Sequence, residues 1–333
     1  MINRIFVCVG LASLTLFLPP CQNEGNPEGV SNPGMSNIGL KDYSVPSICI
    51  SGNNLVAGTV GGAVFLSTDD GLTWRPVDTL HSVNSVPGAN FSIDTRVTLY
   101  NSGSYIFAGA NALEGSIDVS ADNGLTWEEK DSSFDQNVSD FTSIGNNVFA
   151  GTNNGVYLST DYGTSWEPVN NGPLFSSSET TYGHAPQVWT LMAVGSELFA
   201  GTPGEGILES SDYGMDWAQA DNGLNNVGVF GLASIGTVVF AASFSDDSTG
   251  GVFISVNNGS SWQPAYAGLT NHMINFLYAD GSVLFAGSNT CIFRSTDYGA
   301  SWTVLDSLSV GSLVSDGPTL LAGTGNGIVR ISP

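Results

Sequence analysis

The chain is poor in positive charge. Its 333 residues include only 7 lysines and arginines against 30 aspartates and glutamates, which gives a formal net charge of −23. Proteins hold nucleic acids mainly through cationic side chains on the phosphates, so this composition excludes a nucleic-acid partner and disfavours an anionic membrane surface. We expect any partner to be neutral or basic.

Cysteine is also scarce, with four residues, so no disulfide framework is expected. Cys49 and Cys291 fall in repeats that do not adjoin, which argues against a bond between them, and both are expected to be small buried apolar residues. The only histidines, His81, His184 and His272, lie far apart without ligand spacing. We therefore expect no metal site and no other cofactor.

A long apolar run occurs only at the N-terminus. Residues 5–18 follow Arg4 and are fewer than the about 20 residues that a membrane-spanning helix needs, so residues 1–21 are interpreted as an export signal. The segment ends at Cys21 and resembles a bacterial lipoprotein signal, which implies lipidation of Cys21. An ordinary signal peptide, cut nearby, is the alternative. Residues 22–36, rich in glycine, proline and asparagine, are typical of a flexible tether. The expected location is the cell envelope, or outside the cell.

The rest of the chain is built from repeats. Six copies of Ser-x-Asp-x-Gly-x-Thr/Ser-Trp, here called the Ser-Asp motif, begin at Ser67, Ser120, Ser159, Ser210, Ser255 and Ser295. The fifth copy has Asn257 in place of the aspartate, and the fourth has Asp216 in place of the hydroxyl residue. A second pattern, similar to Leu-Phe-Ala-Gly-Thr, occurs seven times, around Ala57, Ala108, Ala150, Ala200, Ala241, Ala286 and Ala322.

These repeats predict a ring of sheets. Each unit contains short apolar runs separated by Asn-Asn, Asn-Gly or Asp-x-Gly turns, which is typical of four strands joined by hairpins. Four-stranded units of about 40–45 residues describe a β-propeller. We predict an all-β, seven-bladed propeller of four-stranded antiparallel blades over residues 37–333, present as a monomer.

The end of the chain predicts how the ring closes. Ser332 stands where a seventh Ser-Asp motif would begin, so the last blade lacks its outer strand. Alignment of the last repeat with the first places residues 37–41 in that position, paired with residues 327–332. Such a closure removes exposed sheet edges.

The Ser-Asp motif resembles the Asp-box (BNR) repeat of sialidases, sortilin-type receptors, xyloglucan-degrading glycosidases and photosystem assembly propellers. The resemblance implies that the box forms the turn between the third and fourth strands of a blade, with its polar residues bonded to the turn and its tryptophan packed between strands. The residues concerned are Asp69, Asp122, Asp161, Asp212, Asn257 and Asp297, with Trp74, Trp127, Trp166, Trp217, Trp262 and Trp302.

The sialidase members of this family use three converging arginines, a Tyr/Glu pair, an acid Asp and an Arg-Ile-Pro segment. This chain has no Arg-Ile-Pro, and its arginines beyond the leader, Arg75, Arg96, Arg294 and Arg330, fall in different strands of different repeats. Sialidase activity is therefore not expected.

A glycosidase that uses two carboxylates is the alternative to a non-catalytic protein, because two Asp or Glu residues suffice for that chemistry. The loop candidates are Asp94, Glu114, Glu179, Glu205, Asp246 and Asp247. Nothing in the sequence marks a pair among them, and the simpler interpretation is solvated loop acids. An ion held by Asp246 and Asp247 is a further alternative.

Long links between repeats indicate where a partner binds. The links at residues 78–95 and 170–188 emerge on one face of the ring, and Trp189, the only tryptophan outside the motif, follows the second link. With Phe175 and Tyr182 it concentrates aromatic side chains there, which are favoured contact residues. We expect a non-catalytic propeller that binds a protein or glycan through this face. Neutral insertions, with Trp189 in the core, are the alternative.

Overall fold

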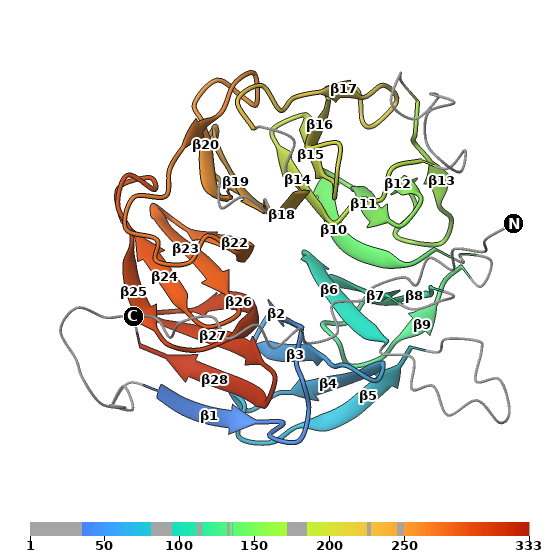
Figure 1. Ribbon diagram of the computed structural model, residues 1–333. Coiled ribbons are helices and arrows are strands. Elements are labelled where there is room, and N and C mark those ends of the chain that lie inside the picture. The colour runs from blue at the N-terminus through green and yellow to red at the C-terminus, as the bar shows by residue number, and fades with distance from the viewer. Residues whose placement is uncertain are drawn as a thin grey trace, which may run out of the picture.

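The structure, a computed structural model, describes residues 35–80, 95–111, 115–131, 134, 136–171, 185–224, 228–244 and 250–332. They form seven four-stranded antiparallel sheets set as blades around an axis, with no helix in this part of the chain (Figure 1). The first strand of each blade lies nearest the axis and contacts the first strands of both neighbouring blades. The predicted seven-bladed propeller is confirmed.

The first four blades follow one another along the chain. Blade 1 consists of β2 (Ser47–Ser51), β3 (Asn54–Gly58), β4 (Ala63–Ser67) and β5 (Arg75–Thr79). Blade 2 consists of β6 (Arg96–Ser102), β7 (Tyr105–Asn111), β8 (Ile117–Ser120) and β9 (Glu128–Glu129). Blade 3 consists of β10 (Val138–Ile144), β11 (Asn147–Thr152), β12 (Gly155–Ser159) and β13 (Glu167–Pro168). Blade 4 consists of β14 (Thr190–Val194), β15 (Glu197–Gly201), β16 (Ile207–Ser210) and β17 (Ala218–Gln219).

The remaining blades continue this order until the last one, which combines both ends of the domain. Blade 5 consists of β18 (Gly228–Ile235), β19 (Val238–Phe244), β20 (Gly251–Ser255) and β21 (Gln263–Pro264). Blade 6 consists of β22 (Ile274–Asp280), β23 (Val283–Ser288), β24 (Ile292–Ser295) and β25 (Thr303–Asp306). Blade 7 consists of β26 (Val310–Asp316), β27 (Thr319–Thr324), β28 (Gly327–Ile331) and β1 (Met35–Gly39).

The core lies in layers between the blades. Val56 and Leu66 of blade 1, for example, pack with Val97 and Ile106 of blade 2. Both faces of each sheet are thus covered, which explains why the strands are continuous apolar runs. The seven alanines of the second repeat pattern are all fully buried in these layers.

Strand β1 closes the ring, as the sequence predicts. It pairs antiparallel with β28, with Asn37 opposite Val329 and Met35 opposite Ile331. The strand begins two residues before the expected start at Asn37 and ends at Gly39. Ser36 and Met35 therefore contribute to the sheet although the sequence places them in the tether.

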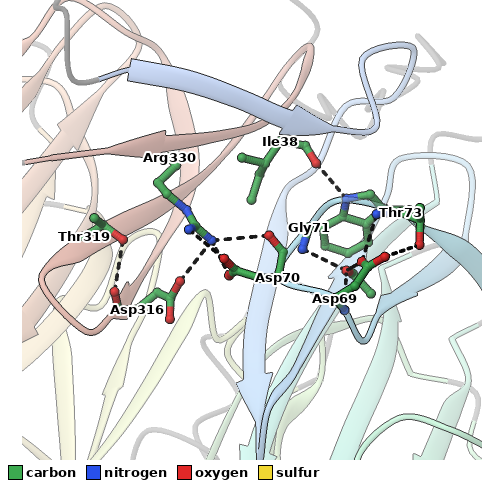
Figure 2. A network of polar contacts seen from close by, with 10 residues as sticks. Ile38, Asp69, Asp70, Gly71, Thr73, Asp316, Thr319 and Arg330 are labelled. Atoms are coloured by element: carbon green, nitrogen blue, oxygen red, sulfur yellow. Dashed lines mark hydrogen bonds and ion pairs between the residues drawn. The ribbon is translucent and has the colours of Figure 1, made fainter.

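Two side-chain contacts join blade 7 to blade 1 at this seam (Figure 2). The indole N–H of Trp74 donates to the carbonyl oxygen of Ile38 on β1 at 2.9 Å. Arg330 on β28 donates to both carboxylate oxygens of Asp70, which belongs to the first Ser-Asp motif, and lies 3.1 Å from Asp316. The hydrogen bond from Arg330 lowers the pKa of Asp70, so this ion pair stays charged.

The Ser-Asp motif forms the turn between the third and fourth strands. In blade 3, Asp161 Oδ1 accepts hydrogen bonds from the Ser159 hydroxyl and the Ser165 backbone N–H, both at 2.9 Å. The Ser159 hydroxyl in turn accepts from the Gly163 N–H at 2.7 Å. In blade 5, Asn257 makes the same bonds and its amide also donates to the Ser261 hydroxyl at 2.8 Å.

The tryptophan at the end of each motif lies at the boundary with the preceding blade. The indole N–H donates to a backbone carbonyl of the preceding blade in four copies, Trp74 to Ile38, Trp217 to Val169, Trp262 to Ala220 and Trp302 to Ala265, at 2.7–2.9 Å. The exceptions are Trp127, which bonds within its own turn, and Trp166, whose buried N–H has no hydrogen-bond partner.

The two cysteines of the described residues do not pair with each other. Cys49 is a free, buried thiol, as expected, and burial raises its pKa to about 12. Cys291 is buried but disulfide-bonded, so the expectation that it is simply a small apolar residue is wrong.

Deletion of the closing strand tests the seam. Removal of residues 22–39 from the mature protein is expected to lower the melting temperature strongly, because β28 loses its partner and Trp74 loses its acceptor. Removal of residues 22–34 leaves β1 intact and is the matched control, expected to melt like the full mature chain. Equal melting of the two truncated proteins in calorimetry would reject the closure.

Replacement of single tryptophans tests the bond between blades. Trp217→Phe is expected to cost about 1–2 kcal/mol more unfolding free energy than Trp166→Phe, because it leaves a carbonyl unpaired while both remove similar buried surface. Urea unfolding of the two variants measures the difference. An equal loss would mean that the indole hydrogen bond does not contribute.

Candidate binding site on the loop face

The antiparallel blades give the ring two different faces. The loops between second and third strands and the links between blades lie on one side, here the loop face. The first hairpins and the Ser-Asp turns lie on the other side, here the turn face. Contacts agree with this division, because the Ser51 hydroxyl and the Asn54 amide of the first hairpin both donate to Asn123, in the next Ser-Asp turn, at 2.8 and 2.9 Å.

Each innermost strand starts at the loop face in the same way. A valine or isoleucine is buried there, and its N–H commonly donates to a carbonyl at the end of the preceding blade's second strand or directly after it. Val188 donates to Thr152, the last residue of β11, and Val229 donates to Thr202, which follows β15. The residue that follows this anchor occupies one equivalent position around the axis. We call it the entry position.

Two neighbouring blades carry aromatic residues at the entry position. Trp189 of blade 4 and Phe230 of blade 5 stack with their ring centroids 4.4 Å apart and their planes at 27°. Both side chains are half-buried. The same position holds Pro46, Thr98, Ser139, Asn275 and Gly311 in the other blades. Trp189 is therefore neither in the core nor free in a loop, but forms part of an aromatic pair near the axis on the loop face.

A carboxylate holds the strand that carries Trp189. Asp140 on β10 accepts hydrogen bonds from the backbone N–H groups of Leu191, across the blade boundary, at 2.9 Å and of Phe141 at 2.8 Å. Burial raises the pKa of Asp140 to about 6, against the lowering effect of these bonds. In blade 1 the Ser47 hydroxyl makes the equivalent bond, accepting from Leu99 at 3.0 Å. Asp140 thus positions the start of β14.

A second acidic site, which sequence reasoning missed, lies between blades 1 and 2. Asp118 on β8 is only 7% exposed, and the carboxyl of Asp78 on β5 lies close enough to affect its pKa. Glu129 lies opposite Asp118 on β9. Burial, and after it the neighbouring carboxyls of Asp78 and Glu129, raise the pKa of Asp118 to about 8.

The repeat itself contains the signal that identifies Asp118. It stands two residues before the motif serine, where the other copies have Phe65, Tyr157, Leu208, Phe253 and Phe293. A carboxyl in an apolar repeat position destabilises the fold unless it keeps its proton.

The close contact between these two carboxyls does not suit glycoside hydrolysis. Glycosidase carboxyls lie roughly 5–9.5 Å apart so that a sugar or a water fits between them. Asp78 instead lies close enough to Asp118 to help keep the proton on that carboxyl. The pair is a proton-dependent contact between blades.

Most other predicted site residues cannot be placed. Phe175, Tyr182, Asp94, Glu114, Glu179, Asp246, Asp247, Cys21, His81 and His184 lie outside the described residues. Glu205, on the loop face of blade 4, donates its backbone N–H to the Thr202 hydroxyl at 2.9 Å. His272 contacts the Gly250 carbonyl at 3.0 Å and packs edge-on against Tyr266.

Two kinds of site are absent from the part of the chain that the structure describes. No three histidine, cysteine or acidic residues come together there in a way that suits a metal ion. None of the described residues forms a long apolar helix of the kind that crosses a membrane.

The arginines occupy separate places, as predicted. Arg75 lies on the outer strand β5, Arg96 on the innermost strand β6, and Arg294 and Arg330 on the third strands of blades 6 and 7. Arg330 is already bonded to Asp70. The three-arginine arrangement of the sialidases is not formed by these residues.

Comparison with known proteins supports the fold. No protein-family model and no curated protein matches the chain. Among solved structures, YCF48 from Cyanidioschyzon merolae is 16% identical at a TM-score of 0.66, covering 90% of this chain and 99% of that one. A structure of YCF48 bound to D1 peptide is 14% identical at 0.66, covering 91% and 98%.

Two larger proteins contain a similar domain. An extracellular domain from B. thetaiotaomicron is 16% identical at a TM-score of 0.67, covering 90% of this chain and 40% of that one. The GH74 xyloglucanase from Xanthomonas campestris is 16% identical at 0.61, covering 88% and 52%. At such identities the likeness establishes a propeller fold and nothing finer.

The Asp118–Asp78 contact predicts how stability depends on pH. Because the folded state raises the pKa of Asp118 from 3.8 to about 8, the unfolding free energy should fall as pH rises through this range. Asp118→Leu, which copies Leu208 of blade 4, should raise stability at pH 8 by about 1–3 kcal/mol. Melting temperatures between pH 4 and pH 9 measure both effects.

The exposed acid Glu167 on β13 provides the matched control, and Glu167→Gln should leave the pH profile unchanged. If Asp118→Leu melts with the same slope against pH as the wild type, the proton-dependent contact does not exist.

Proposed function

We propose that this chain is an exported, non-catalytic Asp-box propeller that binds a protein or glycan through its loop face. The observation that carries the proposal is the stacked pair Trp189–Phe230 at the entry positions of two adjoining blades. Large aromatic side chains lose little conformational entropy on binding and dominate contact energies. Phe175 and Tyr182 belong to the link that leads to Trp189 and extend the same surface in this proposal.

Three further observations support this proposal. The bonds of Asp161, Asn257 and their equivalents lie within the turn, which agrees with a structural Asp-box. A similar propeller, YCF48, has been solved with a bound peptide. The apolar leader supports export, with a lipid on Cys21 as the anchor to the envelope and residues 22–34 as the tether.

The alternative function is a hydrolase that uses loop carboxylates on the same face, and the similarity of this chain's fold to that of a xyloglucanase favours this alternative. Among the candidate carboxylates, Glu205 is the one that lies within the described residues. We expect hydrolysis of xyloglucan and of chromogenic glycosides and sialosides to stay at background. Turnover by the wild type that is lost in Glu205→Gln or Glu179→Gln would replace the binding proposal with the hydrolase.

Replacement of the aromatic pair tests the binding proposal. Trp189→Asn with Phe230→Asn copies Asn275, which blade 6 carries at the same position, and should cost about 1–3 kcal/mol because both rings are half-buried. The double variant is expected to lose binding on an array of plant and microbial glycans and against a displayed peptide library. Tyr213→Asn, on the turn face, is the control and should bind as the wild type does. Ligands held equally by all three proteins would contradict the proposal.

A further inference from the structure

Asp140 is an ionisable residue at a repeat position that is otherwise neutral. The position lies directly after the entry residue, and the other blades hold Ser47, Leu99, Thr190, Gly231, Phe276 and Ser312 there. The fold therefore does not require a carboxylate at this place. Asp140 is half-buried, so a proton from the solvent can reach it while the blade stays folded.

The strand that carries Trp189 is attached to blade 3 on both sides of this tryptophan. Before it, the Val188 N–H donates to the Thr152 carbonyl at 2.8 Å. After it, the Leu191 N–H donates to Asp140 Oδ2 at 2.9 Å, from β14 to the neighbouring strand β10 (Figure 1). The first bond joins two backbone groups and does not change with pH. The second ends on a carboxylate, so it is the attachment that a proton can alter.

Each oxygen of the Asp140 carboxylate already accepts one backbone hydrogen bond. Oδ1 accepts from the Phe141 N–H at 2.8 Å, and Oδ2 accepts from the Leu191 N–H. A backbone N–H cannot accept a proton in return, so a proton on either oxygen opposes one of these bonds. Hydrogen bonds to a charged acceptor are also about twice as strong as those to a neutral one. Protonation of Asp140 therefore weakens the attachment of Leu191 to blade 3.

Few other titratable groups face Asp140 within the described residues. The strands that pack most against β10 are β6, β7, β11 and β14, and the last two contain no titratable residue. Strand β6 carries Arg96 and Tyr100, and β7 carries Tyr105. Burial, and to a smaller extent the charge of Asp140, raise the pKa of Tyr100. The ion pairs of the described residues involve Lys130 and Arg330 and not Asp140.

Protonation of Asp140 has opposite effects on the whole fold and on this attachment. Burial raises the pKa of Asp140 from 3.8 to about 6, while the bonds from Leu191 and Phe141 lower it. Because the folded state raises the pKa, the contribution of Asp140 to the unfolding free energy falls as pH rises through this range. Acid therefore stabilises the fold slightly while it loosens the bond to Leu191. A melting temperature alone does not report the second effect.

We propose that Asp140 is a proton-controlled support of the aromatic pair on the loop face. Its ionised carboxylate holds the start of β14 so that Trp189 stays stacked on Phe230, with ring centroids 4.4 Å apart. Its protonation loosens this start and disturbs the stack. The consequence rests on the proposed function of the pair: a partner is held at neutral pH and released in acid. Asp140 is a positioning residue here, because it contacts the strand and not the partner.

The test follows Trp189 by fluorine NMR in the mature full chain labelled with 5-fluorotryptophan. The Trp189 signal is identified by its loss in Trp189→Phe. We expect it to shift between pH 4 and pH 8 with a midpoint near the pKa of about 6, while the signal of Trp302, bonded to Ala265 at another blade boundary, stays constant. In Asp140→Asn, which keeps an acceptor oxygen but cannot ionise, the Trp189 signal should not shift.

Two further variants complete the test. Asp140→Ser copies Ser47, whose hydroxyl makes the equivalent bond in blade 1, and should give a folded protein with a constant Trp189 signal. His184→Gln is the matched control, because His184 is close to Trp189 in the sequence and histidine titrates in the same range, and it should keep the wild-type shift.

A wild-type Trp189 signal that stays constant with pH would overturn the proposal. A shift of equal size in Asp140→Asn or Asp140→Ser, or its loss in His184→Gln, would also overturn it. The measurement uses no ligand, so its outcome is separate from whether the loop face binds a partner.

Discussion

In four of the seven blades, the hydrogen bond from the motif tryptophan to a carbonyl of the preceding blade ties neighbouring sheets together. A buried indole N–H is costly to leave unpaired, and in these blades its acceptor is a carbonyl on or beside the preceding outer strand. The Ser-Asp turn holds the indole in that position. Its serine and aspartate accept hydrogen bonds from the backbone N–H groups of the turn, and the tryptophan that follows contacts the preceding blade. At the seam, the same bond from Trp74 to Ile38 recruits a strand from the other end of the domain.

Residues that recur in every blade are explained by the fold. Positions at which one blade differs from the others are therefore the candidates for a role beyond folding. Asp118 occupies a repeat position that is apolar or aromatic in the other blades with the motif. Trp189 and Phe230 occupy a position that holds smaller or polar residues in the other blades. Tyr213 occupies a motif position that holds asparagine in two other copies. The Trp189–Phe230 stack contributes buried surface to the ring, whereas Asp118 costs stability at its blade interface once it is charged. Positions that break a local rule without a gain in stability are candidates for function.

The sequence predicted the features that repeat and missed those that depend on a neighbouring blade. Blade number, turn chemistry and the closing strand follow from the spacing of two motifs, although β1 begins at Met35 because β28 pairs through Ile331. The Asp118–Asp78 contact joins strands of different blades, and the sequence of a single repeat does not show which strands face each other across a blade boundary. The sequence of the motif likewise does not show how far the rings of Tyr162, Tyr213 and Tyr298 are covered. Only coordinates show that their rings stay exposed while Trp166 and Trp217 are buried.

The two faces can differ in chemistry because the ring separates them. Each blade spans the full thickness of the domain and contacts only its neighbours, so a change at one strand end alters local contacts and leaves the ring closed. The loop face therefore carries an aromatic pair at its entry positions, while the carboxylates of the turn face are bonded within the Ser-Asp turns. The excess of acidic over basic residues disfavours anionic partners. In the proposed function, specificity depends on the aromatic pair of the loop face.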